Sequence, residues 1–451
     1  MITLATQEKD FAMKANILLI ALCCAILVAL AGCSLDQLSP NAPTDAQVLS
    51  TPEGVKAVAV GMQAQYGEGV NETVEVSNFL TKMFATMPAS VLGLRELETG
   101  GTDVQPFNGT VNNMWSTHFR TIKSAEDLIN NAPKVPLTPG TRSGILALAR
   151  LFKAMSLGEL IECYEKLPIE VTTSTTPIFA DRTTVLNYVI SLLEAARDEY
   201  ASQPGSAYTD FNSTILGIGL DLPNTIQAMI ARYALIKGDY AKAIAAANAV
   251  DLTKSSSLFY NSTTSRNPIY LIAIQTVYYK PVRSFRLSAE AGDGRVAYWV
   301  SASTATSFLG TPVDDFAQFK TDNAKYYVYL PGEIMLIKAE AYARQNDLAN
   351  ALTEVNRART KTTDAAGIGA NLPAKTSAQL STQQAMLDEI YNQRLYELLM
   401  LGTRLGDTRR FNKQAADPAV PKAQWSRTRN WFPYPDTERL SNPNTPADPS
   451  L

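Results

Sequence analysis

Two stretches of the chain share a pattern that restricts the fold more than any other feature of the sequence. Residues 231–250 and 339–358 each begin as an Ala-rich helix, pass a short polar turn that contains Asp, and continue as a second helix. Alanine at matched positions lets paired helices approach closely, which is how tetratricopeptide units stack. The sequence therefore predicts helix pairs of this kind, with an irregular spacing between the units.

Most of the chain after residue 51 also shows helical periodicity. In residues 142–164, apolar side chains recur at spacings of three to five. Further helices are expected at residues 124–130, 183–200, 223–250, 331–360 and 382–411. Strand alternation is scarce, and its two best examples are residues 269–277 and 326–330. The predicted fold class is therefore mostly α.

Long loops separate these helices. They are expected at residues 68–112, 202–222, 253–319 and 415–451. The last of them is rich in Pro, which removes a backbone donor and disfavours regular structure. Loops of this length in a compact protein usually carry function.

The N-terminal region has the pattern of a secreted, lipid-anchored protein. Lys14 precedes an unbroken apolar run of 15 residues, 17–31, which fits a signal peptide and is short for a membrane span. The run ends in Leu30-Ala31-Gly32-Cys33, which resembles a bacterial lipobox, in which the Cys sulfur is acylated. Two or three long acyl chains anchor a protein stably to a membrane. We expect a signal peptide at 1–32, a lipidated tether at 33–50 and a folded body at 51–451.

Charge and histidine content exclude several function classes. With 40 basic and 43 acidic residues, the chain lacks the basic footprint of a nucleic-acid-binding protein. Its single His, His118, argues against most zinc sites and His-dependent catalysis, and its apolar neighbours indicate a core position. After signal cleavage and lipidation of Cys33, only Cys163 remains as a free thiol. No metal ion or cofactor is expected.

Residues 387–410, LDEIYNQRLYELLMLGTRLGDTRR, resemble the C-terminal signature of the SusD/RagB family of outer-membrane lipoproteins. The residues in register with that signature are Arg394, Glu397, Gly402, Arg404, Asp407 and Arg410. The chain departs from it at Gln393, Leu401 and Thr408. Residues 329–359 are similar to a helix pair of the same family. On these motifs the chain is identified as a member of the SusD/RagB family.

The resemblance implies a SusD-like helical body with tetratricopeptide-like helix pairs, long loops and a loop-rich ligand-binding region. Residues 51–330 would carry the variable loops, and residues 331–451 the family signature. Family members lie on the outer membrane, facing the cell exterior, and cover a TonB-dependent porin of the SusC type. They capture oligosaccharides, or peptides in the RagB branch, and deliver them to that porin for import. The resemblance thus implies a nutrient-uptake protein that is not an enzyme.

Two hypotheses from other classes stay open beside this one. The first is a helical-repeat scaffold for envelope proteins without a small ligand. The second is a lipid-anchored hydrolase that uses carboxylates. Glu333 and Glu340 lie seven residues apart on one helical face, about 10 Å by the helical rise, without a surrounding cleft signature. The sequence also lacks a nucleophile elbow, so it weighs against the hydrolase.

The acidic residues of the signature have basic neighbours. Arg394 and Glu397 lie three residues apart, as do Arg404 and Asp407, so each pair can meet on one face of a helix. We therefore interpret these residues as structural ion pairs.

A sugar-binding site needs flat aromatic faces together with a few polar groups. The expected ligand-binding residues are Asp103, Phe107, Asn108, Tyr298 and Trp299. Tyr298 and Trp299 are preferred because the nearby run Gly292-Asp293-Gly294 indicates an exposed loop.

Lipidation at Cys33 is directly testable. Because the lipobox Cys carries the acyl chains, Cys33→Ala should abolish palmitate labelling, stop normal processing and release the protein from the membrane. Metabolic labelling and membrane fractionation measure this. A variant that stays membrane-bound and is processed like the wild type would contradict the assignment.

Overall fold

The computed structural model describes residues 44–171 and 174–450. The predicted signal peptide, Cys33 and most of the predicted tether lie outside the described residues. The described end of that tether contains a short helix, α2 (Asp45–Val48). Thr44 and Gln47 cause it, because each side chain accepts a hydrogen bond from the backbone N–H of the other. In the part of the chain that the structure describes, no helix is long and apolar enough to cross a bilayer.

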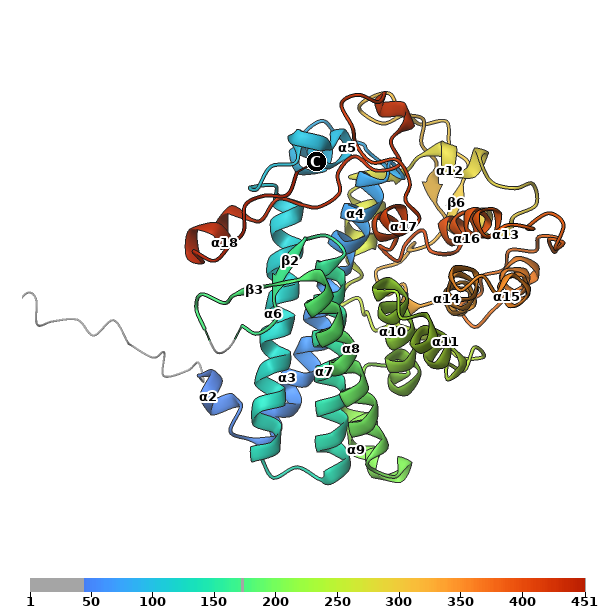
Figure 1. Cartoon of the computed structure of the whole chain (residues 1–451). Helices are drawn as coiled ribbons and strands as arrows, with labels where there is room; N and C mark the ends of the chain where they lie inside the picture. Colours follow the sequence, from blue (N-terminus) through green and yellow to red (C-terminus); the bar gives the residue numbers. More distant parts are fainter. Residues whose placement is uncertain (1–43, 172–173, 451) are drawn as a thin grey trace, which may run out of the picture. The chain divides into compact units, whose positions relative to one another are not determined.

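Four long helices form the first half of the body, which begins at Leu49 (Figure 1). They are α3 (Pro52–Glu68), α6 (Gly109–Asn131), α7 (Pro139–Ile161) and α8 (Arg182–Ala201). Helix α7 packs against both α6 and α8 and is buried on almost every side, as its apolar composition requires. Each helix starts at a side-chain cap that accepts a backbone N–H three residues ahead. The four caps are Thr51, Asn108, Thr138 and Asp181.

The helix pairs predicted from the repeat are confirmed. Helices α10 (Leu222–Lys237) and α11 (Tyr240–Asn248) form the first pair, and α14 (Pro331–Arg344) and α15 (Leu348–Thr360) the second. Helix α11 packs against α14, so the two pairs stack, and α10 packs against α8.

The turns of the two pairs have the same construction. Gly238 and Asn346 adopt left-handed backbone conformations, with φ of 90° and 61°. The following residues, Asp239 and Asp347, cap the second helix of each pair by accepting a backbone N–H three residues ahead. The two polar turns of the repeat therefore share one construction, a left-handed residue followed by a capping Asp.

The predicted helix at 382–411 is two helices, α16 (Gln383–Glu397) and α17 (Arg404–Arg410). The break lies at the intervening segment, where Gly402 has a φ of 68°. A side chain at this position would also press against Thr73 of α4. Helix α16 packs against α14 and α15, whereas α17 packs against α4 (Val70–Leu80). Because of the break, the two halves of the signature contact different parts of the fold.

The prediction of a loop at residues 68–112 is wrong. It contains the almost completely buried helix α4, the strand β1 (Phe84–Thr86), the helix α5 (Leu92–Thr99) and a 3-10 turn, η1 (Gly101–Asp103). Several buried positions of α4 are polar, among them Glu75 and Asn78, which obscures the apolar periodicity that identifies a helix.

The strands pair two by two, all antiparallel. The pairs are β1 with β5 (Tyr279–Pro281), β2 (Lys166–Pro168) with β3 (Phe179–Asp181), β4 (Ser256–Leu258) with β8 (Tyr326–Tyr329), and β6 (Val300–Ser301) with β7 (Asp315–Phe316). The prediction of a strand at 326–330 is confirmed by β8. The prediction at 269–277 is wrong, because Asn267 accepts the N–H groups of Ile269 and Tyr270 and starts a π-helical turn, η4 (Tyr270–Gln275).

Short elements fill the remaining connections. They are η2 (Ala132–Lys134), η3 (Gly205–Tyr208), α9 (Thr209–Thr214), α12 (Arg283–Leu287), α13 (Gly294–Trp299), η5 (Lys422–Gln424) and α18 (Asp436–Ser441). The tail from residue 415 is mostly irregular, as its Pro content predicts.

The close packing of α7 on α10 is testable at Gly158. A Cβ atom there would overlap the buried ring of Tyr233. Gly158→Ala should therefore lower the free energy of unfolding by about 1–3 kcal/mol, the usual cost of overpacking. Gly61→Ala is the matched control, because its Cβ would meet no atom within 4 Å and Ala is the better helix former. Chemical denaturation measures both, and equal stability of the two variants would contradict the packing.

Candidate functional site

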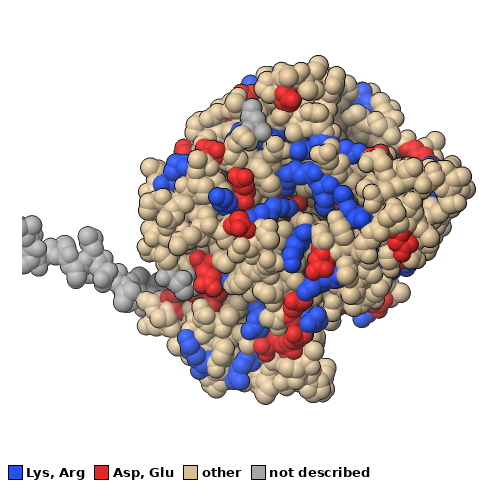
Figure 2. Space-filling model, viewed as in Figure 1, with Lys and Arg blue, Asp and Glu red and all other residues tan. Residues whose placement is uncertain are grey.

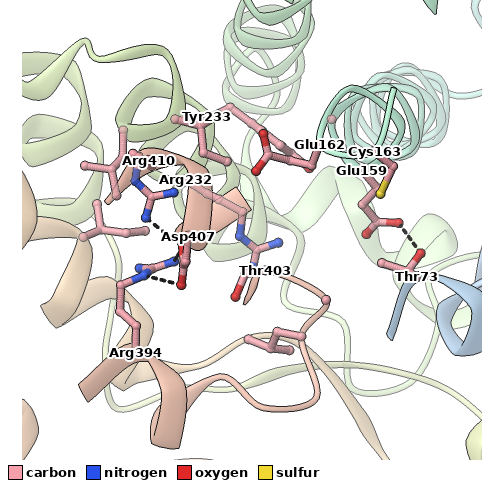
Figure 3. Close-up of a pocket in the computed structure, with 16 residues that line it drawn as sticks. Thr73, Glu159, Glu162, Cys163, Arg232, Tyr233, Arg394, Thr403, Asp407 and Arg410 are labelled. Atoms are coloured by element: carbon pink, nitrogen blue, oxygen red, sulfur yellow. Dashed lines mark hydrogen bonds and ion pairs between the residues drawn. The ribbon is translucent and has the colours of Figure 1, made fainter. Parts of the chain in front are cut away.

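The SusD/RagB-like signature meets the central helices in a cluster of buried ion pairs (Figure 3). Arg394 of α16 donates from Nε and Nη2 to the two carboxylate oxygens of Asp407 in α17, each at 2.9 Å. Arg410 donates a hydrogen bond to Asp407 at 2.8 Å. It also donates to both carboxylate oxygens of Glu340 in α14, at 2.7 and 2.9 Å. The cluster therefore ties α14, α16 and α17 together.

The sequence predicted different partners for these residues. Glu397 pairs with Lys361 and with Arg295, at 3.4 Å from the latter, instead of with Arg394. Arg404 donates to the Tyr391 carbonyl at 3.1 Å, and its guanidinium lies 3.7 Å from the centre of the Tyr391 ring. The predicted pairing within one helix is wrong, because the break before α17 lets residues distant in sequence compete for each carboxylate.

Arginine side chains pair with both carboxylates of this cluster. Burial by itself raises the pKa of Asp407, but Arg394 and Arg410 outweigh it and hold that pKa below its ordinary value. Arg232 pairs with Glu333 and donates to both of its carboxylate oxygens at 2.6 and 2.7 Å. Glu333 and Glu340 thus each face arginine, and they do not face one another as a retaining pair would.

His118 lies in the core, as expected. Its Nε2 is 3.1 Å from the Thr73 hydroxyl and 3.2 Å from a carboxylate oxygen of Glu159. Burial lowers the pKa of His118 to about 3 and raises that of Glu159 to about 7. A neutral, buried imidazole of this kind is a packing residue.

The assignment of Tyr298 and Trp299 to an exposed loop is wrong. They end the helix α13, and Trp299 is only 3% exposed, with its indole Nε1 donating to the Tyr396 carbonyl at 2.9 Å. Tyr298 is half-buried and donates its hydroxyl to the Ala366 carbonyl. The Asp293 that indicated a loop accepts the Arg295 N–H and caps this helix instead.

Of the three predicted ligand-binding residues that precede α6, Asn108 has a structural role, whereas Asp103 and Phe107 are exposed. Asn108 is 2% exposed and caps α6, while its amide donates to the Gly93 carbonyl and to Glu96 of α5. It is too buried for ligand contact. Asp103 and Phe107 are exposed, and Phe107 shows 65% of its surface.

Sequence reasoning missed a second exposed ring beside α5. Phe308 is 47% exposed, and the Arg95 guanidinium of α5 lies 4.8 Å from the centre of its ring. The loop that carries Phe308 is fixed by its own N–H, which donates to the Thr86 carbonyl at 3.1 Å. The aromatic residue in the turn Ser307-Phe308-Leu309-Gly310 is the signal that would have found it.

Phe107 and Phe308 thus each lie next to α5, and we call the exposed residues at this helix the α5 face. It consists of Leu92, Arg95, Phe107, Phe308 and Leu309. Asn108, the neighbour of Phe107, donates to the Gly93 carbonyl of α5, and the Arg95 guanidinium of the same helix lies over the Phe308 ring. In Figure 1 α5 lies at the end of the long helices α4 and α6.

Residues 295–446 match the model of the SusD family. This range contains the second helix pair and the whole signature. The resemblance to the SusD/RagB family is confirmed. No curated protein matches the sequence.

Solved structures extend the likeness to almost the whole chain. NanU of B. fragilis is 14% identical, with a TM-score of 0.68 over 91% of this chain and 99% of that one. A SusD superfamily protein of Bacteroides thetaiotaomicron is 15% identical, with a TM-score of 0.67 over 88% and 100%. A SusD-like carbohydrate binding protein of Bacteroides vulgatus is 16% identical, with a TM-score of 0.66 over 86% and 96%. At this identity they show that the fold is SusD-like.

The buried ion pairs generate a stability prediction for this SusD-like fold. Asp407→Asn removes the charge between Arg394 and Arg410, and should lower the free energy of unfolding by about 3 kcal/mol or more. Asp388→Asn is the control, because the Asp388 ion pair with Lys413 is half-exposed and should be worth less than about 1 kcal/mol. Urea denaturation measures both. Similar losses in the two variants would mean that the cluster does not tie the helices together.

Proposed function

We propose that this chain is a surface lipoprotein that captures oligosaccharides without turning them over. In this proposal residues 1–32 are removed, Cys33 carries the lipid, and residues 51–451 form the binding body. The body presents its ligand to a TonB-dependent, SusC-type transporter of the outer membrane. The family match and the fold support this class, and one solved structure with the same fold is described as a SusD-like carbohydrate binding protein.

The observation that carries the proposal is the α5 face. Two exposed aromatic rings, Phe107 and Phe308, each lie next to α5, and rings of this kind pack against the flat apolar faces of sugars. The Arg95 guanidinium lies over the Phe308 ring, and its N–H groups are donors that hydroxyl groups of a sugar can accept. The exposed side chains of Leu92 and Leu309 extend the apolar surface, and such patches mark interaction sites.

The carboxylates of α5 have structural roles, which supports binding without catalysis. Glu96 accepts the Asn108 amide at 2.7 Å, and Glu98 accepts the Thr86 backbone N–H at 2.8 Å. Burial raises the pKa of Glu98 above its ordinary value. A glycosidase needs two carboxylates that both face the scissile bond.

The α5 face is tested with Phe308→Ala, after a glycan and peptide screen has identified the ligand of the wild type. Loss of one stacked ring should weaken binding by about tenfold, since such a contact contributes about 1–1.5 kcal/mol. The melting temperature should hardly change, because the ring is half-exposed. Phe259→Ala is the matched control: its ring is 46% exposed but lies beside α3, and it should bind like the wild type.

Isothermal titration measures the affinities of the three proteins. Equal affinity of the wild type and Phe308→Ala would remove the α5 face from the proposal. Release of shortened sugars during the titration would contradict the non-enzymatic function. A wild type that binds neither glycans nor peptides, but retains envelope proteins, would favour the scaffold hypothesis.

A further inference from the structure

Two adjoining cavities lie where α17 meets the ends of α7, α8 and α10. The outer cavity is about 230 Å³ and is lined by Glu162, Arg182, Gly406, Arg409, Arg410 and Trp431. The inner cavity is about 40 Å³ and shares Glu162 and Arg410 with the outer one. Figure 2 shows Lys and Arg side chains gathered around a hollow near the centre of the side of the molecule that it draws. We call the two cavities together the arginine cleft.

Positive charge exceeds negative charge in the outer cavity. Arg410 shares Glu340 with Arg344 and Asp407 with Arg394. Arg182 and Arg409 share the single carboxylate of Glu162. Glu162 is ionised, because Arg182 and Arg409 outweigh its burial and lower its pKa. One guanidinium charge at the mouth of the cleft therefore has no carboxylate of its own.

The two arginines are held in place by contacts that leave this charge uncompensated. Arg409 donates to the carbonyl groups of Asn430 and Glu162, and its guanidinium lies 4.0 Å from the centre of the Trp431 ring. Arg182 lies 5.3 Å from the centre of the same ring. Burial lowers the pKa of Arg409 to about 10, with Arg182 adding to this effect. The positions of the charges are thus built into the fold before any ligand arrives.

In the inner cavity, hydrogen-bond donors exceed acceptors. Arg394 is 3% exposed and lines this cavity, and its Nη1 has no acceptor among the described residues. The hydroxyl of Thr403, also buried and without a partner there, lines the same cavity. A buried donor without an acceptor is costly, and this cavity is large enough for an oxygen ligand or water.

We propose that the arginine cleft binds an oxyanion, that is, a carboxylate, sulfate or phosphate group. The group would lie between Arg182 and Arg409, with its negative charge offsetting the excess guanidinium charge. Arg394 and Thr403 would donate to an oxygen of the group or to water bound behind it. The oxyanion is either a free inorganic ion or the acidic group of a sugar whose ring packs on Trp431. This site is separate from the α5 face and does not depend on the function proposed for it.

The test is a titration of the purified protein with sodium sulfate, sodium phosphate, sodium acetate, sodium glucuronate and glucose at constant ionic strength. Calorimetry and Trp fluorescence should both show saturable binding to the wild type, with Trp431→Phe removing the fluorescence change. Arg409→Gln should weaken binding by about tenfold or more, because it removes a charged hydrogen-bond donor. Arg197→Gln is the control, since Arg197 is exposed on α8 and pairs with the neighbouring Asp198.

Comparing glucuronate with acetate and glucose distinguishes the two sources of the oxyanion. Tighter binding of glucuronate than of acetate, with no binding of glucose, identifies an acidic sugar, whereas equal binding of all anions identifies a free ion. If Arg409→Gln does not fold, Arg182→Gln at the more exposed edge of the cleft takes its place. The absence of saturable binding to the wild type, or equal affinity of the Arg→Gln variants in the cleft and of Arg197→Gln, overturns the proposal.

Discussion

The buried ion pairs of Asp407 and Glu340 are the interaction on which the rest of the structure depends. Arg394 and Arg410 bring three helices, α14, α16 and α17, to one point. A buried carboxylate that loses its partner is strongly destabilising, so these contacts select one arrangement of the helices over all others that would expose a charge. The α14 end of this cluster also belongs to the helix-pair stack, which connects the signature to the repeat.

Glycine makes this concentration of charge possible. A Cβ atom on Gly406 would overlap the Glu162 carboxylate, and one on Gly332 would overlap that of Glu397. Both carboxylates therefore lie directly against a helix backbone, where their arginine or lysine partners reach them from the other side. The signature is conspicuous in sequence because it combines charged residues with the glycines that leave room for them.

The rigid centre leaves two different surfaces beside it. The α5 face is apolar and aromatic, and is held by Asn108 and by the hydrogen bond of Phe308 to the end of β1. The arginine cleft is cationic, and its charges are fixed by Glu162 and Trp431. A sugar ring packs on apolar area, whereas an oxyanion needs hydrogen-bond donors, and different residues of the fold contribute the exposed apolar side chains and the guanidinium groups.

The sequence by itself determined what depends on neighbours along the chain. Helical periodicity, the Asp caps of the helix pairs and the signature residues are local patterns, and they predicted the mostly helical SusD-like body. Tertiary structure alone decided which partner each charge takes and which rings stay exposed. Asp407 finds Arg394 across a helix break, Trp299 is buried because Asp293 starts a helix, and Phe308 is presented because a strand end holds its loop. Burial and pairing at long range depend on how elements pack, and one-dimensional spacing carries no record of that packing.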